Sequence, residues 1–145
     1  MNLPRRLTPE ESDALNAVLQ KLSARARHTL TLSGLLQRWQ DFVLQIEQGY
    51  QDSIYEYTND LSVRDLLEEV LKEVPQTLQK ELTQLIRPWD ARFDNATKKT
   101  RRPVLPHIGQ ESLSWWWFRV PKHLGEELEA DLRSLVEDSV RRAWR

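Results

Sequence analysis

The chain contains no cysteine, and only four of its 145 residues are glycine. The absence of thiols excludes disulfide bonds, thiolate metal sites and a cysteine nucleophile. The sequence also lacks a glycine-rich phosphate-binding loop and the Gly-x-Ser-x-Gly pattern of many serine hydrolases. No recognisable catalytic motif is therefore present, and the sequence favours a protein that is not an enzyme.

An excess of one charge and long apolar runs are also missing. The formal net charge is -1, so the positive field that would attract nucleic acid to the whole molecule is absent, and only a local patch can support such a role. No run approaches the roughly 20 apolar residues of a membrane-spanning helix, and residues 1–7 do not lead into a signal-peptide core. We expect a cytoplasmic protein without a membrane partner.

The residues that are abundant point to a helical globular protein. Hydrophobic residues make up 39% of the chain and charged residues 30%, which is typical of a folded protein. Leu, Glu, Gln and Arg are frequent, and all four are good helix formers. A chain of 145 residues has the length of one ordinary domain. We predict a single domain over 1–145, with residues 1–7 flexible.

The longest helical pattern covers residues 31–61. Its apolar residues alternate by threes and fours, as they do on one face of a helix, and we predict one long amphipathic helix with this arc buried. Gly49 and Ser53 lie at the margin of the arc and are small enough for another helix to cross there. The arc consists of Leu32, Leu35, Leu36, Trp39, Val43, Ile46, Tyr50, Ile54, Tyr57 and Leu61.

Two capping boxes mark the starts of further helices. Thr8 and Glu11 have the spacing in which a hydroxyl and a carboxylate cap the first turn, and the helix they begin should end near Arg27. Ser62 and Asp65 have the same spacing. They predict a short third helix that ends at Val74, because the residue before Pro75 disfavours helical geometry.

The second half of the chain predicts two more helices and an irregular segment. One helix should run over 75–96, kinked or divided at Pro88, and the last over 124–144. The segment 98–121 between them has no sustained period. The predicted fold class is all-α: a single-domain bundle of four to six helices with one long central helix and a Pro- and Trp-rich irregular segment packed across it.

The irregular segment contains three consecutive tryptophans, Trp115, Trp116 and Trp117. Burial of the tryptophan surface is strongly favourable, so at least two of the three should lie inside. Residues 114–120 fit a short strand and a single helical turn about equally well. The segment is long for a structureless connection, which indicates that it is either functional or packed onto the bundle.

A basic run close to these tryptophans gives a nucleic-acid hypothesis. Basic side chains can contact phosphates while an exposed tryptophan stacks on an unpaired base, which is how many proteins bind single strands. The alternative is a solvated basic loop beside tryptophans that close the core. The candidates are Lys98, Lys99, Arg101, Arg102, Trp115, Trp116, Trp117 and Arg119.

A charge-free strip lies beside the buried arc of the predicted long helix. Interface centres are poor in charge and rich in tyrosine, so this strip is a candidate surface for a partner protein or for self-association. The segment 98–121 covering it within the same chain would explain it equally well. The strip consists of Gln37, Gln40, Leu44, Gln48, Gln51 and Tyr55.

The polar side of the long helix offers acidic residues, but a magnesium site would need further acids from a facing helix. We interpret these residues as a solvated charged face. The first group is Asp52, Glu56, Asn59 and Asp60, and the possible second group is Asp65, Glu68, Glu69 and Glu73.

The three histidines match no metal-binding motif. We predict neither a metal nor a cofactor.

Other charged residues are predicted to have structural roles. Asp90, Asp94 and Lys98 follow one another at helical spacing and predict an exposed ion-pair ladder, worth a few tenths of a kcal/mol per pair. Arg92 or Arg119 is a candidate to hold the tryptophan segment by stacking on a ring.

These features predict a small non-catalytic protein–protein interaction module, such as an accessory subunit, an adaptor or an inhibitor. It would act through a helix face or through the tryptophan segment. The first alternative is a nucleic-acid-associated accessory subunit, and the second is a magnesium-dependent all-α phosphohydrolase. Another protein or a second copy of the chain is the expected partner, and no small-molecule ligand is predicted.

Overall fold

The protein folds into a mostly helical single domain, which confirms the predicted fold class. The computed structural model describes residue 3, residues 5–104 and residues 113–143, with side chains described as far as residue 134. None of the helices in these ranges is long and apolar enough to cross a membrane. The five α-helices are α1 (Pro9–Ala26), α2 (Leu32–Gln48), α3 (Ile54–Glu73), α4 (Gln76–Ala96) and α5 (Glu126–Ala143).

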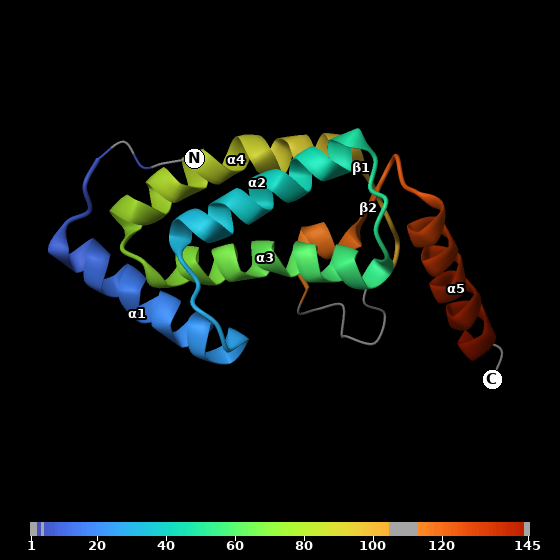
Figure 1. The fold of residues 1–145 in the computed structure, drawn as a ribbon, viewed down its shortest axis with the longest axis horizontal. Coiled ribbons are helices and arrows are strands. Elements are labelled where there is room, and N and C mark those ends of the chain that lie inside the picture. The colour runs from blue at the N-terminus through green and yellow to red at the C-terminus, as the bar shows by residue number, and fades with distance from the viewer. Residues whose placement is uncertain (1–2, 4, 105–112, 144–145) are drawn as a thin grey trace.

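The α2 helix lies at the centre of the bundle and packs against both α3 and α4. Figure 1 shows α1 crossing one end of these three helices, while α5 stands at the opposite end. Five aromatic rings fill the space between α2, α3 and α4, with neighbouring ring centroids 5.1–5.9 Å apart. They belong to Trp39, Phe42, Tyr50, Tyr57 and Phe93, and all five side chains are buried.

The predicted start of the first helix is confirmed. The Thr8 hydroxyl accepts a hydrogen bond from the Glu11 amide, and the Glu11 carboxylate accepts one from the Thr8 amide. The helix ends at Ala26, where Arg27 takes a left-handed conformation with φ of 61°. Capping residues located the start of α1, and the end of its apolar stripe located its end near Arg27.

Residues 1–7, predicted to be flexible, include a side chain that ties the N-terminal segment to two helices. Arg5 donates to Glu11 at 2.6 and 2.7 Å and to Glu81 on α4 at 2.7 Å. The guanidinium holds the pKa of the buried Glu11 carboxyl well below its ordinary value. Residues 1, 2 and 4 lie outside the described residues, so the prediction of flexibility stays open for them.

The prediction of one long helix over 31–61 is wrong, because the chain turns at Gly49. This glycine ends α2 with φ of 105°, a backbone conformation that other residues rarely adopt. Tyr50 then pairs through its backbone with the segment before α5: its amide donates to His123 at 2.9 Å, and its carbonyl accepts from Gly125 at 2.6 Å. Ser53 caps the new helix, so the two small residues mark a helix boundary and not a helix crossing.

Replacing Gly49 by alanine should lower the free energy of unfolding by about 1–3 kcal/mol, because alanine would be strained at this φ. In a continuous helix the same substitution would instead raise stability by about 1 kcal/mol. Urea unfolding followed by circular dichroism distinguishes the two signs. Gln48→Ala, one residue earlier and exposed, serves as the control and should change stability by less than about 0.5 kcal/mol.

The helix that follows the turn is longer than predicted. The α3 helix continues through Ser62, whose hydroxyl donates to the Asn59 carbonyl and caps no new helix. The predicted third helix is therefore the second half of α3. The α4 helix likewise continues through Pro88 without being divided. Pro88 lies on the exposed side, where water can reach the carbonyl that lacks its N–H partner.

The tryptophan segment combines both local structures that the sequence left open. A 3-10 helix covers Trp115–Phe118, and the strand β2 (Arg119–Pro121) follows directly. This strand pairs antiparallel with β1 (Thr97–Lys99), which continues from α4. Residues 105–112 of the predicted irregular segment lie outside the described residues.

The predicted last helix is confirmed as α5. Leu128 on its first turns is fully buried, and the Asp131 carboxylate accepts a hydrogen bond from the Ile54 amide at 2.9 Å. This bond joins α5 to the start of α3. The contact is local, and Figure 1 shows the rest of α5 extending away from the bundle.

Candidate functional site

The tryptophan segment is held by a carboxylate inside the bundle. Trp116 and Trp117 are buried, which confirms that at least two of the three tryptophans lie inside. The Trp116 Nε1–H donates to the Asp65 carboxylate at 2.8 Å, and the Trp117 Nε1–H donates to both of its oxygens at 3.0 Å. Burial raises the pKa of Asp65, and the two indole donors partly offset this effect. One acid of α3 therefore holds both buried indoles.

Trp115 differs from its two neighbours because 42% of its surface is exposed. Its ring packs edge-on against Trp116 at a centroid distance of 5.7 Å, and tilted against Phe93 at 6.0 Å. A 3-10 helix has three residues per turn, so Trp115 and Phe118 lie on the same side of this short helix. Trp116 and Trp117 turn into the bundle, whereas Trp115 and Phe118 face outward.

Trp115 and Phe118 line a cleft of about 880 Å³, which we call the Trp115 cleft. Its basic residues are Lys99, Arg101 and Arg119. Asp94 and Thr100 complete the lining. Four of the predicted nucleic-acid residues are thus brought together, namely Lys99, Arg101, Trp115 and Arg119.

Arg119 forms a fixed wall of the cleft. Its guanidinium donates to the Thr97 hydroxyl at 3.0 Å and to the carbonyls of Asp94 and Thr97 at 2.7 and 2.8 Å. It also forms an ion pair with the Asp94 carboxylate at 3.1 Å. Lys99 and Arg101 are exposed, and in the described part of the chain neither forms an ion pair. They are the cations that a ligand in the cleft can reach.

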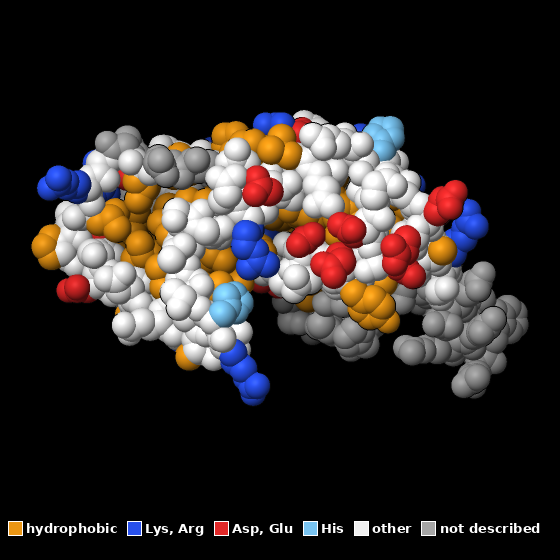
Figure 2. All heavy atoms as spheres, in the orientation of Figure 1, with side chains coloured by type: hydrophobic (Ala, Val, Ile, Leu, Met, Phe, Trp, Pro, Cys, Tyr) orange, Lys and Arg blue, Asp and Glu red, His pale blue; other side chains and the backbone are white. Residues whose placement is uncertain are grey.

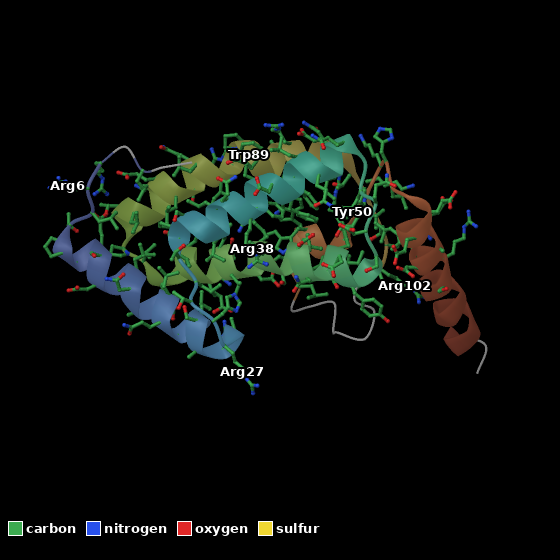
Figure 3. All side chains as sticks on the ribbon, viewed as in Figure 1. Arg6, Arg27, Arg38, Tyr50, Trp89 and Arg102 are labelled. Carbon is green, nitrogen blue, oxygen red and sulfur yellow. The ribbon has the colours of Figure 1, made fainter. Side chains whose placement is uncertain are left out.

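The remaining nucleic-acid candidates lie elsewhere. Lys98 faces the other side of the hairpin and lines a second cavity of about 1010 Å³ with Lys122 and His123. Arg102 is exposed at the α5 end of the bundle, as Figure 3 shows, but it does not line the Trp115 cleft. Trp116 and Trp117 are too deeply buried to stack on a base.

The predicted partner-binding strip is not one helix face. Gln37, Gln40, Leu44 and Gln48 lie on α2, but Gln51 follows the turn and Tyr55 belongs to α3. Because the chain changes direction at Gly49, the angular spacing that placed all six residues on one strip does not apply. Tyr55 is 81% exposed, whereas Leu44 is half-buried. Whether any of these residues binds a partner stays a prediction.

The acids proposed for a magnesium site do not face one another in a ligand set. Each residue of the second group has another role, because Asp65 accepts from the tryptophans, Glu68 binds Arg64, and the other two pair with α1. Those two pairs are Arg25 with Glu69 and Lys21 with Glu73. Among the described residues, no three acidic or histidine side chains group to hold a metal ion.

The first group of acids remains on the surface near the start of α3. Figure 2 shows acidic side chains gathered over this half of the helix. The carboxylates of Asp60, Asp52 and Glu56 contribute to the raised pKa of the Tyr50 phenol, after burial, and Asp60 accepts the Tyr50 hydroxyl hydrogen bond at 3.1 Å. This region carries negative charge and is separate from the lining of the Trp115 cleft.

The predicted ion-pair ladder is also wrong, because its members have different partners. Asp90 accepts from Arg64 at 2.9 and 3.0 Å and from the Trp39 Nε1–H at 3.1 Å. Asp94 pairs with Arg119, and Lys98 lies on β1. Helical spacing alone cannot identify these partners, since they come from other elements.

Sequence reasoning missed Arg64, whose guanidinium lies 4.4 Å from the ring centroid of Trp116. Arg64, and not Arg92 or Arg119, therefore stacks on the tryptophan segment. Arg92 stacks on Trp89, which is labelled on α4 in Figure 3. A signal was present, since Arg64 follows Leu61 by three residues and precedes Leu67 by three, on the buried side of α3.

The chain was compared with protein-family models, with curated proteins and with solved structures, and none of them matches.

Proposed function

We propose that this protein is a small non-catalytic interaction module that binds a partner protein through the Trp115 cleft. The observation that carries the proposal is the partly exposed ring of Trp115, which is packed against Phe93 and Trp116. Binding hot spots are enriched in tryptophan, and a side chain already held in place loses little conformational entropy when a partner binds. The tryptophan segment is therefore a better candidate than the interrupted strip on α2 and α3.

The cleft has the size and chemistry of a binding site. Its volume of about 880 Å³ falls within the usual range of ligand pockets, and it can accept one or two side chains of a bound segment. The polar groups that catalysis would need have structural partners: the Thr100 hydroxyl donates to the Arg102 carbonyl at 2.6 Å, and Asp94 pairs with Arg119. Both groups are thus already engaged within the chain, which favours binding over catalysis.

A second candidate function is binding of single-stranded nucleic acid, and one observation favours it. Lys99 and Arg101 line the same cleft as Trp115, so a base could stack on the indole while the cations contact phosphates. Against this, the third cation, Arg119, is already paired with Asp94. We therefore place this function second.

A peptide-display selection tests the proposed function. A library of random linear peptides is selected on the immobilised full chain and on its Trp115→Ala variant. The unmodified chain should enrich a family of peptides, and the variant should bind the same peptides about 10-fold or more weakly, because Trp115 lines the cleft. Binding is measured by fluorescence anisotropy with resynthesised, labelled peptides.

Tyr55→Ala is the matched control, since it removes another exposed aromatic ring from a different surface. Circular dichroism and urea unfolding establish that both variants are folded. Loss of binding in Tyr55→Ala with no change in Trp115→Ala would show that the partner binds the charge-free strip around Tyr55 and not the Trp115 cleft. Failure of the unmodified chain to enrich any peptide beyond the Trp115→Ala variant would contradict the proposal.

A further inference from the structure

We infer that the Trp115 cleft recognises an acidic segment of the partner that carries one large apolar side chain. This inference rests on the proposed function, because it specifies the chemistry of the partner that the same cleft binds. The occupant follows from two properties of the described lining. Trp115 and Phe118, which we call the floor, are aromatic, and Lys99 and Arg101, which we call the rim, have no ion-pair partner among the described residues.

The aromatic floor favours contact with an apolar side chain of the partner. Trp115 and Phe118 both face the cleft, and the exposed part of the Trp115 ring is available for contact. Aromatic pairs prefer edge-to-face or offset arrangements, and Trp115 already has such a contact with Trp116 at an interplanar angle of 77°. A phenylalanine, tyrosine or leucine of the partner can pack against the remaining ring surface and remove it from water.

The register of the hairpin places positive charge beside this floor. Lys99 is paired with Arg119, and side chains of directly paired residues project on the same face of a ladder. Lys98, paired with Val120, projects on the opposite face and lines the second cavity. The rim cation Lys99 therefore points toward the cleft as a consequence of strand register.

Among the lining residues that the structure describes, the charges do not balance. Asp94 neutralises Arg119, with 3.1 Å between the carboxylate and the guanidinium. Lys99 and Arg101 then leave an excess of positive charge around an apolar floor. Carboxylates of a docked segment complement this rim and would also steer its approach.

Carboxylates fit this rim better than a chain of phosphates. Nucleic-acid affinity usually depends on many phosphate contacts, whereas the cleft offers Lys99 and Arg101 as its accessible cations. The whole chain has a net charge of -1, and the acids Asp52, Glu56 and Asp60 gather near the start of α3. A long polyanion would meet repulsion there, while a short acidic segment can stay within the cleft.

Charge reversal of the rim provides the test. The same peptide library is selected on the full chain, on Lys99→Glu/Arg101→Glu, and on the control Lys72→Glu/Arg87→Glu. The control makes the same change in net charge at exposed residues outside the cleft. The unmodified chain and the control should both enrich peptides rich in Asp and Glu with one large apolar residue, and the rim variant should enrich basic peptides instead.

Affinities of resynthesised peptides complete the test. Replacing every Asp and Glu of an enriched peptide by Asn and Gln should weaken its binding to the full chain about 10-fold or more, and added salt should reduce the difference. A labelled oligothymidylate is measured in parallel as the nucleic-acid probe. It should bind more weakly than the acidic peptides.

The outcomes separate this inference from the proposed function. Peptides whose binding depends on Trp115 but which show no acidic bias would overturn the inference and leave the proposed function in place. The absence of any Trp115-dependent peptide would overturn both. Tighter binding of the oligothymidylate than of any peptide, lost in the rim variant, would replace the acidic segment by a nucleic acid as the occupant.

Discussion

Replacing Arg64 by methionine should lower the free energy of unfolding by about 3–5 kcal/mol, because it removes one side of a buried charge network. The Arg64 side chain is only 7% exposed, and its guanidinium donates to both oxygens of Asp90 and to Glu68. Methionine fills much of the space but leaves the largely buried Asp90 carboxylate without its cation. Urea unfolding followed by circular dichroism measures the loss.

Arg25→Met is the matched control, because Arg25 also forms hydrogen bonds with both oxygens of one carboxylate, that of Glu69. This pair lies at the surface, with the Arg25 side chain 56% exposed, so its loss should cost less than about 1 kcal/mol. An equal loss in the two variants would show that the buried network contributes no more than a surface ion pair.

A double variant tests whether the cost comes from the unpaired charge. Arg64→Met/Asp90→Asn removes the cation together with the charge of its partner, while the Asn oxygen can still accept from the Trp39 Nε1–H. It should be more stable than Arg64→Met alone, because breaking a buried pair from one side costs more than removing both charges. Equal stability of the two variants would attribute the cost to the lost packing of Arg64 on Trp116, which both of them lack.

Replacing Trp39 by alanine should cost about 3–5 kcal/mol, because it leaves a cavity where α2, α3 and α4 meet. The side chain has no exposed surface, and its ring lies 5.7 Å from that of Phe42 and 5.1 Å from that of Phe93. Its Nε1–H also holds Asp90, so the variant affects the aromatic cluster and the charge network together. The change in the urea midpoint reports the loss.

Two further variants interpret this result. Trp39→Phe keeps an aromatic ring but removes the N–H, and should cost about 1–3 kcal/mol. Trp115→Ala makes the same substitution as Trp39→Ala at a residue that is 42% exposed, and should cost clearly less. A Trp115→Ala variant as unstable as Trp39→Ala would mean that Trp115 closes the core and does not serve as a binding surface.

Properties that depend on neighbouring residues could be predicted from the sequence. Thr8 and Glu11 begin α1 because their side chains bond to amides within one turn, and Pro75 limits the preceding helix for an equally local reason. Burial of two tryptophans could also be expected, because the free energy of removing such a large apolar surface from water does not depend on which partner covers it.

The turn at Gly49 illustrates what periodicity cannot show. The apolar spacing from Ile46 to Tyr50 and Ile54 continues across the turn, and all but the half-buried Ile54 are buried, as one helix would also require. The turn is stabilised by the backbone bonds of Tyr50 to His123 and Gly125, which come from the distant end of the chain. A pattern within one window contains no information about such a pairing.

The composition and the local patterns of the sequence therefore determined a mostly helical domain, most helix ends and the burial of two of the three tryptophans. Only the tertiary structure decided which of the neighbouring cations share a cleft with Trp115, because strand register turns Lys98 and Lys99 to opposite sides of the hairpin. It also decided that Arg64 is the cation beside Trp116 and Asp90, since α3, α4 and the tryptophan segment meet only in the folded chain. Charges and rings adjacent in sequence become a site only when packing fixes the side to which each one points.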